Sequence, residues 1–215
     1  MIPEWCTLSE RIDFLKSSFG RQPYAQPAAA RSSVSLLGWT TLDRVLSAPN
    51  QPDVLTVREG RLVDVASPRS ADDVRALMAD GISTVIRASE RHDEGLRRLA
   101  DSFKALLPAK IHVQLYATPA GTHSYGWHYD LEDVFIAQTL GVKDYYMREN
   151  TVGGAAGASE TFDFGCIRKE TSPLMQARLI AGDWLYIPRR WWHLVLCAED
   201  SLSISVGVMR SVIKA

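Results

Sequence analysis

Apolar residues in the first half of the chain recur every three or four positions, which is the spacing of one helix face. Four stretches share this spacing and end at, or just before, a glycine or a proline: residues 7–20, 42–49, 70–81 and 89–107. Thr7 with Glu10 forms a capping box ahead of the first stretch, and Ser70 with Asp73 opens the third. This half is therefore predicted to alternate short helices and strands, with one strand over residues 82–87.

The second half of the chain changes to a period of two, which is the period of a strand. Ile111, Val113 and Leu115 alternate with polar residues, and residues 201–208 repeat the alternation. Between them, the glycine-rich stretch 151–159 is expected to be a mobile loop, either a lid over a site or a passive connection. The pattern predicts a mainly β protein with N-terminal helices (α+β), closed as a barrel or jelly roll.

We expect residues 1–108 to pack on a β core of residues 109–215, so that the two form one compact domain. Within the first part, residues 22–35 are rich in proline, alanine and serine and are predicted to run over the surface. A chain of 215 residues with 46% hydrophobic and 23% charged residues is typical of a soluble globular domain.

Charge and cysteine content indicate which partners and which cellular location to expect. The 24 basic and 25 acidic residues give a formal net charge of −1, so no nucleic-acid partner is expected. The N-terminus lacks a signal-peptide pattern and the apolar runs are short, so no membrane partner is expected either. Three widely spaced cysteines, Cys6, Cys166 and Cys197, form neither a disulfide framework nor a metal knot, which favours a reducing, cytoplasmic location.

The first candidate for chemistry is a His-x-Asp pair at His128 and Asp130. Two residues apart on an extended segment, both side chains point to one face and can meet one metal ion. A distant His193 completes two imidazoles and one carboxylate, the facial triad of non-haem Fe(II) oxygenases. The alternative is a chance His-x-Asp pair together with a buried His193 beside two tryptophans.

Lys143 is the second candidate, fifteen positions after His128 and on the next expected strand beyond a turn at Gly141. A lone lysine inside an apolar barrel is costly unless an anion meets it. Further along, a turn at Gly182 and a bend at Pro188 frame a short strand before His193, and residues 201–208 follow closely enough to predict a hairpin with the His193 strand.

Two segments together resemble the JmjC family of Fe(II)- and 2-oxoglutarate-dependent oxygenases, especially its cupin-like protein hydroxylases. One is H-x-D followed by D-V-F-x-x-Q-x-x-G-x-K over residues 128–143, and the other is G-D-x-L-Y-I-P-x-x-W-W-H over residues 182–193. The resemblance covers about residues 111–208. It implies a double-stranded β-helix (jelly roll, cupin/JmjC-like), iron held by His128, Asp130 and His193, and Lys143 paired with the distal carboxylate of 2-oxoglutarate.

The chain departs from the family pattern at three positions. Val134 and Gly207 stand where related hydroxylases often place asparagine, and Tyr125 stands where they place threonine or serine. Tyr125 and Tyr116 are therefore alternative cosubstrate-binding residues, each equally well explained as packing. Of the other histidines, His123 is expected at the rim, and His112 is expected to make a core or substrate-side hydrogen bond.

The resemblance implies hydroxylation of an amino acid side chain in a peptide or protein. One alternative is a small-molecule oxygenase, which includes natural-product tailoring and oxidative demethylation. A second alternative is a non-catalytic cupin-like binding module, but such a module has no need of the three ligands and Lys143 together. We further expect an open groove rather than a sealed cavity at the site, with a wall that includes these residues: Tyr125, Trp127, Ser203, Ser205 and Gly207.

Overall fold

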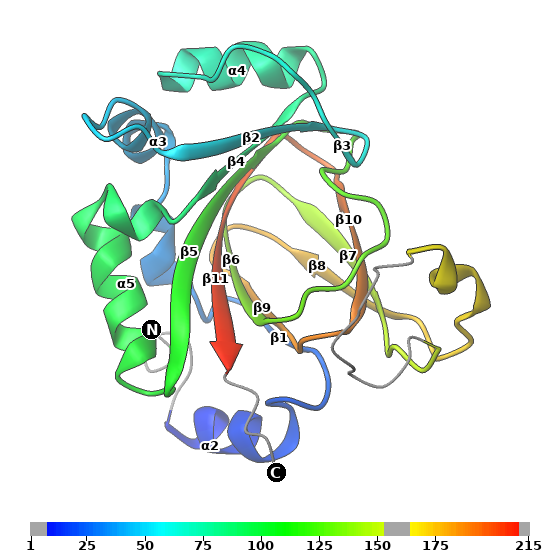
Figure 1. Cartoon of the computed structure of the whole chain (residues 1–215). Coiled ribbons are helices and arrows are strands. Elements are labelled where there is room, and N and C mark those ends of the chain that lie inside the picture. Colours follow the sequence, from blue (N-terminus) through cyan, green and yellow to red (C-terminus); the bar gives the residue numbers. More distant parts are fainter. Residues whose placement is uncertain (1–7, 153–163, 211–215) are drawn as a thin grey trace.

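The computed structural model describes residues 8–152 and 164–210, and two sheets dominate it (Figure 1). Four α-helices and three 3-10 helices are formed: α2 (Leu8–Ser17), η1 (Arg31–Ser35), α3 (Trp39–Leu46), α4 (Ala71–Ala79), η2 (Ser89–Arg91), α5 (Glu94–Lys104) and η3 (Phe164–Lys169). The strands are β1 (Tyr24–Gln26), β2 (Asp53–Arg58), β3 (Arg61–Leu62), β4 (Ser83–Arg87), β5 (Ala109–Thr118), β6 (Asp133–Leu140), β7 (Lys143–Arg148), β8 (Met175–Leu179), β9 (Trp184–Ile187), β10 (Trp192–Cys197) and β11 (Ser201–Arg210).

The strands form a large and a small antiparallel sheet. The large sheet has the order β1-β9-β6-β11-β5-β4-β2-β3, and the small sheet has the order β10-β7-β8. Apolar residues from β6 and β9 of one sheet and from β7 and β8 of the other share a core between them. This confirms the predicted mainly β jelly roll with N-terminal helices.

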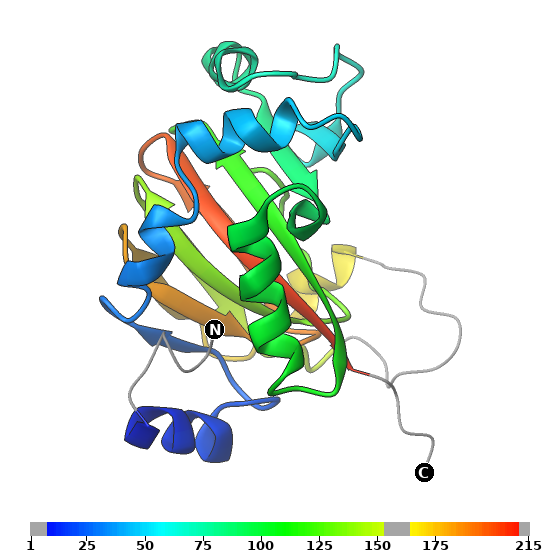
Figure 2. The same ribbon diagram turned by 90° about the vertical axis from the view of Figure 1, so that its left-hand side faces the viewer.

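Alternation along β5 and β11 gives the large sheet two different faces. Their apolar residues, such as Val113 and Val206, join a core with Leu99 and Phe103 of α5. Figure 2 looks onto this helical layer, with α3 and α5 across the strands. The polar residues of the same strands, such as Gln114 of β5 and Ser203 and Ser205 of β11, line a pocket between the sheets. The sheet thus buries one face under helices and lines a pocket with the other.

The predicted hairpin of residues 201–208 with the His193 strand is wrong. β10 pairs with β7, with His193 opposite Met147, whereas β11 lies between β5 and β6 in the other sheet. Both edges of β11 are therefore hydrogen-bonded to neighbouring strands. The turn after Cys197 crosses from one sheet to the other. That turn packs on the β6–β7 turn, where Gly141 has φ of 71° and a side chain would collide with the Asp200 carbonyl oxygen.

Two predictions in the first half also need correction. The helix expected over residues 89–107 is two elements, because Asp93 is extended (φ −141°, ψ 134°) after η2 and begins α5 as its N-cap, accepting from the Leu96 N–H at 3.0 Å. The stretch 22–35 is not simply surface loop, since it contains β1, which pairs with β9, and the buried Ala30.

The other helices lie close to their predicted positions. Ser70 caps α4 with the predicted partner Asp73 in a capping box. Thr7 of the first capping box and residues 153–159 of the glycine-rich stretch fall outside the described residues. Within the part of the chain that is described, no helix has both the length and the apolar character needed to cross a membrane.

Candidate active site

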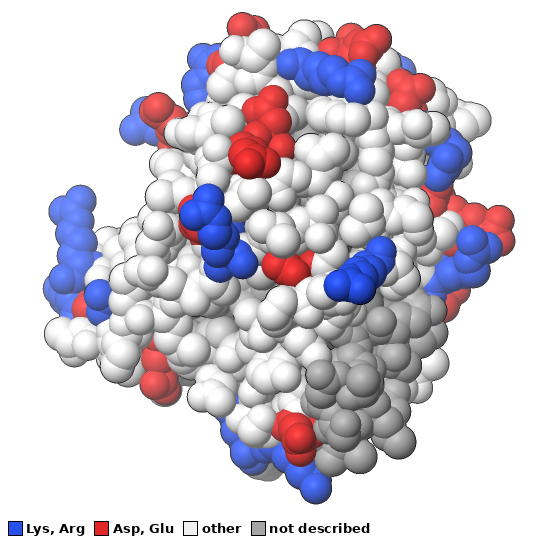
Figure 3. Space-filling view, turned by 180° about the vertical axis from the view of Figure 1, so that it is seen from behind, with Lys and Arg blue, Asp and Glu red and all other residues white. Residues whose placement is uncertain are grey.

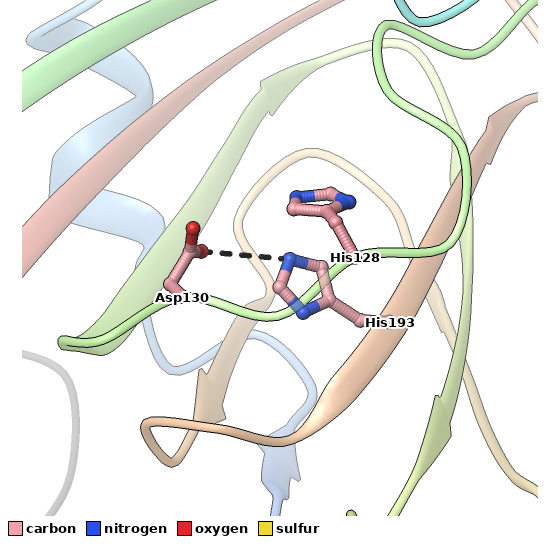
Figure 4. Close-up of side chains that lie close together, drawn as sticks. All are labelled: His128, Asp130 and His193. Carbon is pink, nitrogen blue, oxygen red and sulfur yellow. Dashed lines mark ion pairs between the residues drawn. The ribbon is translucent and has the colours of Figure 1, made fainter. Parts of the chain in front are cut away.

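Backbone contacts bring the three predicted metal ligands together at one end of the barrel. His128 lies in the long connection between β5 and β6, where it forms an isolated bridge to His193 of β10, with N···O distances of 3.1 and 2.8 Å. The Asp130 carbonyl oxygen accepts a hydrogen bond from the Arg190 N–H at 2.7 Å. Figure 4 shows the three side chains turned toward one another.

The geometry of this cluster suits one metal ion. One ligand atom from each of His128, Asp130 and His193 lies within 4.8 Å of the others, and His193 Nε2 is 3.6 Å from Asp130 Oδ2. His128 Nδ1 lies 2.8 Å from the Gly126 carbonyl oxygen, and His193 Nδ1 lies 3.0 Å from that of Trp191. Because a carbonyl oxygen only accepts, these contacts assign the proton to Nδ1 and leave Nε2 as the metal-facing lone pair.

The electrostatics of the cluster favour a neutral imidazole. Burial, and then the neighbouring His193, lower the pKa of His128 to about 4. A metal binds the unprotonated form of histidine, so protons compete little at this ligand near neutral pH. These three residues, together with the neutral state of His128, fit the Fe(II) triad that the sequence predicted.

Lys143 lies at the other end of the same pocket, at the start of β7. Its side chain is buried, with 4% of the residue exposed, and its Nζ donates to Ser203 Oγ at 2.9 Å. Among the described residues, no carboxylate lies within ion-pairing distance of this Nζ, and burial lowers the pKa of Lys143. A buried ammonium group held only by a hydroxyl provides a binding position for an anion.

The pocket between these two ends has a volume of about 330 Å³ and is open to solvent on one side. Its wall includes Asp130, whose side chain is 40% exposed, and Arg87, whose side chain is 48% exposed. This agrees with the predicted open groove. Tyr125, Ser203 and Ser205 line it as predicted, whereas Trp127 and Gly207 do not belong to the wall.

The two tyrosines take different places in this wall. The Tyr116 ring lies 5.5 Å from Lys143 Nζ, and its hydroxyl donates to Gln114 Oε1 at 3.1 Å. The Tyr125 ring lies 5.4 Å from the His128 ring, so it borders the metal ligands instead. Burial raises the pKa of both phenols, which keeps them protonated as hydrogen-bond donors.

Several polar residues of the pocket were not singled out from the sequence. Gln114 and Glu132 belong to its wall. The inward alternation of β5 was the available signal for Gln114. Ser203 was predicted as a wall residue, but not as the hydroxyl partner of Lys143. His112 makes the expected hydrogen bond, to Glu132 at 3.1 Å, and His123 is not part of the ligand cluster.

Comparisons with known proteins agree with the family that the sequence resembles and with the fold. The model of the JmjC domain family matches residues 87–215. The bifunctional lysine-specific demethylase and histidyl-hydroxylase NO66 of Drosophila yakuba is 26% identical over 136 residues, which cover 62% of this chain and 20% of that protein. Ribosomal oxygenase 1 of Gallus gallus is 33% identical over 98 residues, which cover 43% of this chain and 16% of that protein.

Solved structures show the same fold. The structure of YcfD from Escherichia coli superposes with a TM-score of 0.71 at 20% identity, covering 94% of this chain and 53% of that one. The complex of the same ribosomal oxygenase with cobalt and succinic acid gives a TM-score of 0.69 at 19% identity, with 97% and 53% covered. The chain thus spans about half the length of these structures and a smaller part of the curated relatives. Since the family model matches more than half of it, the chain belongs to the JmjC domain family.

Proposed function

We propose that this protein is an Fe(II)- and 2-oxoglutarate-dependent oxygenase that hydroxylates an amino acid side chain in a peptide or protein. One observation carries the proposal: a buried Lys143 without a carboxylate partner shares a pocket with the cluster of His128, Asp130 and His193. A three-ligand metal site leaves coordination positions open, and the lysine offers a counter-charge for an acid bound beside it. With iron and 2-oxoglutarate bound here, dioxygen would be the oxidant: one oxygen atom would convert 2-oxoglutarate to succinate and carbon dioxide, and the other would hydroxylate a substrate C–H bond.

Each protein group has a distinct task in this proposal. His128, Asp130 and His193 hold the metal, with each imidazole aimed by the carbonyl oxygen that its Nδ1 contacts. Lys143 and Ser203 receive the distal carboxylate of 2-oxoglutarate, where the ammonium group offsets the buried negative charge. Tyr116 and Tyr125 are the further candidate donors on the two sides of this subsite.

A peptide or protein substrate is favoured over a small molecule because the wall of the pocket is exposed on one side. Arg87 and Asp130 lie at this opening, so a side chain can enter from a backbone that stays outside. The names of the relatives, histidyl-hydroxylase and ribosomal oxygenase, also denote oxidation of protein. The complex of YcfD with cobalt and 2-oxoglutarate supports the cofactor assignment.

The surface and the cysteines bear on partners and location. On the face seen in Figure 3, basic and acidic side chains are interspersed among other residues, which offers no basic field for a phosphate backbone. Within the described residues, Cys166 and Cys197 form no disulfide. We therefore propose a cytoplasmic protein that acts on a peptide or protein rather than on nucleic acid.

The test is anaerobic reconstitution with Fe(II) and 2-oxoglutarate, followed by exposure to oxygen with and without a peptide library. We expect succinate to form slowly without peptide and faster with a peptide that gains about 16 Da by mass spectrometry. His128→Ala, which lacks one ligand, is the inactive control. Stimulation by small metabolites only would favour the small-molecule oxygenase, and absence of succinate from the metal-loaded protein would favour the binding module.

A further inference from the structure

The segment that carries Asp130 is anchored at its first residue, Tyr129, whose buried ring packs edge to face on Trp192 with the ring centroids 4.8 Å apart. Residues 129–132 form no regular strand before β6 begins. The main chain of Asp130 is held by the Arg190 N–H, but its carboxylate is 40% exposed and within the described chain contacts only His193, at 3.6 Å. The direction of this carboxylate therefore depends on what fixes the residues beside it.

Glu132 is the next side chain of this segment that turns into the barrel. Leu131 between them is 49% exposed, whereas the Glu132 side chain is 14% exposed. Its Oε1 lies 3.1 Å from His112 Nε2 on β5. Since β5 pairs with β11 along its whole length, this contact ties the far end of the segment, beyond Asp130, to the most extensively paired part of the large sheet.

Gly207 provides the space for this pair. It lies opposite His112 in the β5–β11 ladder, and its φ is not positive, so its backbone does not require glycine. A glycine inside a strand costs stability, so its presence calls for another reason. A Cβ at this position would lie 2.5 Å from His112 Nε2 and 2.6 Å from Glu132 Oε2. Any larger residue would displace the pair.

We propose that Glu132 is a positioning residue for the metal site. Joined to His112 in the space that Gly207 leaves, it holds the segment 129–132 so that the Asp130 carboxylate faces His128 and His193. This inference rests on the proposed metal ligands and adds a residue that acts through one of them. Groups that orient a metal ligand commonly matter about 10- to 100-fold in metal affinity or activity.

The contacts extend beyond the pair along the inner face of β5. Gln114 Nε2 lies 3.1 Å from His112 Nε2, and the Tyr116 hydroxyl donates to Gln114 Oε1 at 3.1 Å. A row of polar side chains thus runs from the segment of Asp130 to the neighbourhood of Lys143. Glu132 is the end of this row that touches the metal segment, which makes it the position to change.

The experiment measures Co(II) binding to the metal-free full-length protein, without 2-oxoglutarate, by the visible absorption of the bound ion. We expect Glu132→Ala to weaken Co(II) binding about 10- to 100-fold and to change the ligand-field bands, because Asp130 loses its orientation. Glu132→Gln keeps an oxygen within reach of His112 and should bind close to wild type. Gly207→Ala should weaken binding in the same direction as Glu132→Ala.

Glu90→Ala is the matched control. Glu90 Oε2 accepts the Val113 N–H at 2.9 Å, so it also anchors β5, but among the described residues it has no hydrogen bond to the segment 129–132. We expect this variant to lower the melting temperature without changing Co(II) affinity or its spectrum. Wild-type Co(II) binding by Glu132→Ala, or an equal loss in Glu90→Ala, would overturn the positioning role. Wild-type binding by His128→Ala would instead refute the metal site itself, so the two failures are distinguishable.

Discussion

The two ends of the pocket are built in different ways. At the metal end, main-chain hydrogen bonds between His128 and His193 fix the ligands, and each imidazole is further aimed by a carbonyl oxygen. At the other end, Lys143 Nζ has the Ser203 hydroxyl and the Tyr116 ring beside it, and no carboxylate of the described residues pairs with it. The first end is assembled before a metal arrives, whereas the second carries an uncompensated buried charge until an anion binds.

Because of this difference, the metal end should mainly affect the affinity for metal, whereas Lys143 should also affect the folding stability of the ligand-free protein. A preformed ligand set stabilises bound metal with little reorganisation, and its loss removes binding without relieving strain. An unpaired buried ammonium group costs folding free energy, and the protein recovers that free energy only when it binds the anion. The two ends should therefore respond in opposite ways when their key residues are replaced.

The largest effect is expected at the metal end. His193→Ala removes a ligand and should weaken Co(II) or Fe(II) binding by well over 100-fold, since replacing even the outer partners of ligands costs about 10- to 100-fold. Succinate formation should fall below detection. Calorimetric titration with Co(II) measures the affinity, and His123→Ala, a nearby histidine outside the cluster, is the control. Full activity in His193→Ala would make His123 the ligand to examine.

At the other end, Lys143→Ala should weaken 2-oxoglutarate binding while metal affinity stays nearly unchanged. Loss of a charge-assisted contact to a desolvated carboxylate costs about 2 to 4 kcal/mol, or roughly 30- to 1000-fold in Kd. Lys143→Arg should be milder. Calorimetric titration of the metal-loaded variants with 2-oxoglutarate is the measurement, and wild-type affinity in Lys143→Ala would exclude this role.

The same lysine should behave oppositely in the absence of ligand. Lys143→Met replaces an unpaired charge by an apolar side chain of similar length, so the melting temperature of the ligand-free protein should rise. His193→Ala offers no such gain. A lower melting temperature for Lys143→Met would contradict the contrast between the two ends.

The next effect in size concerns pH and the metal end. The pKa of His128 is near 4 in the folded protein and 6.5 in an unfolded chain, so between these values the unfolded chain binds more protons. Stability of the metal-free protein should thus fall as the pH drops from 6.5 toward 4, by at most about 1.4 kcal/mol per pH unit from this group. Urea unfolding at several pH values should show a weaker dependence for His128→Gln than for wild type. An equal pH dependence of the unfolding free energy in the two proteins would contradict the lowered pKa of His128.

The residues at the two ends differ in how well the sequence revealed them. The triad and Lys143 lie in two motifs whose combined resemblance to the JmjC family predicted that they share one site. Glu132 and Gln114 did not emerge, because their role depends on which strands β5 and the following loop meet across the barrel. Pairing of β11 with β5 and β6, rather than with β10, was equally hidden, since alternation fixes which face a strand buries but not its neighbours.

Helix starts differ from strand pairing in this respect. The apolar spacing of the stretch 89–107 begins only at Leu96, and Asp93 is a residue type typical of helix N-caps, so the start of α5 at Glu94 had a local signal in the sequence. At α4 the same kind of signal, Ser70 with Asp73, forms a capping box in the structure. A cap needs only neighbours in sequence, whereas the pairing of β11 depends on strands that are distant in the chain.

The smallest effects should come from the two tyrosines, which border opposite ends of the pocket. Tyr116 lies beside Lys143, so Tyr116→Phe should weaken 2-oxoglutarate binding by about 1 kcal/mol, roughly fivefold, through loss of one hydrogen-bond donor. Tyr125 lies beside His128, farther from the expected distal carboxylate, so Tyr125→Phe should change that affinity about twofold or less. Calorimetric titration with 2-oxoglutarate ranks the pair. The reverse ranking would move the cosubstrate subsite toward the metal end and reassign Lys143 to a position beyond it.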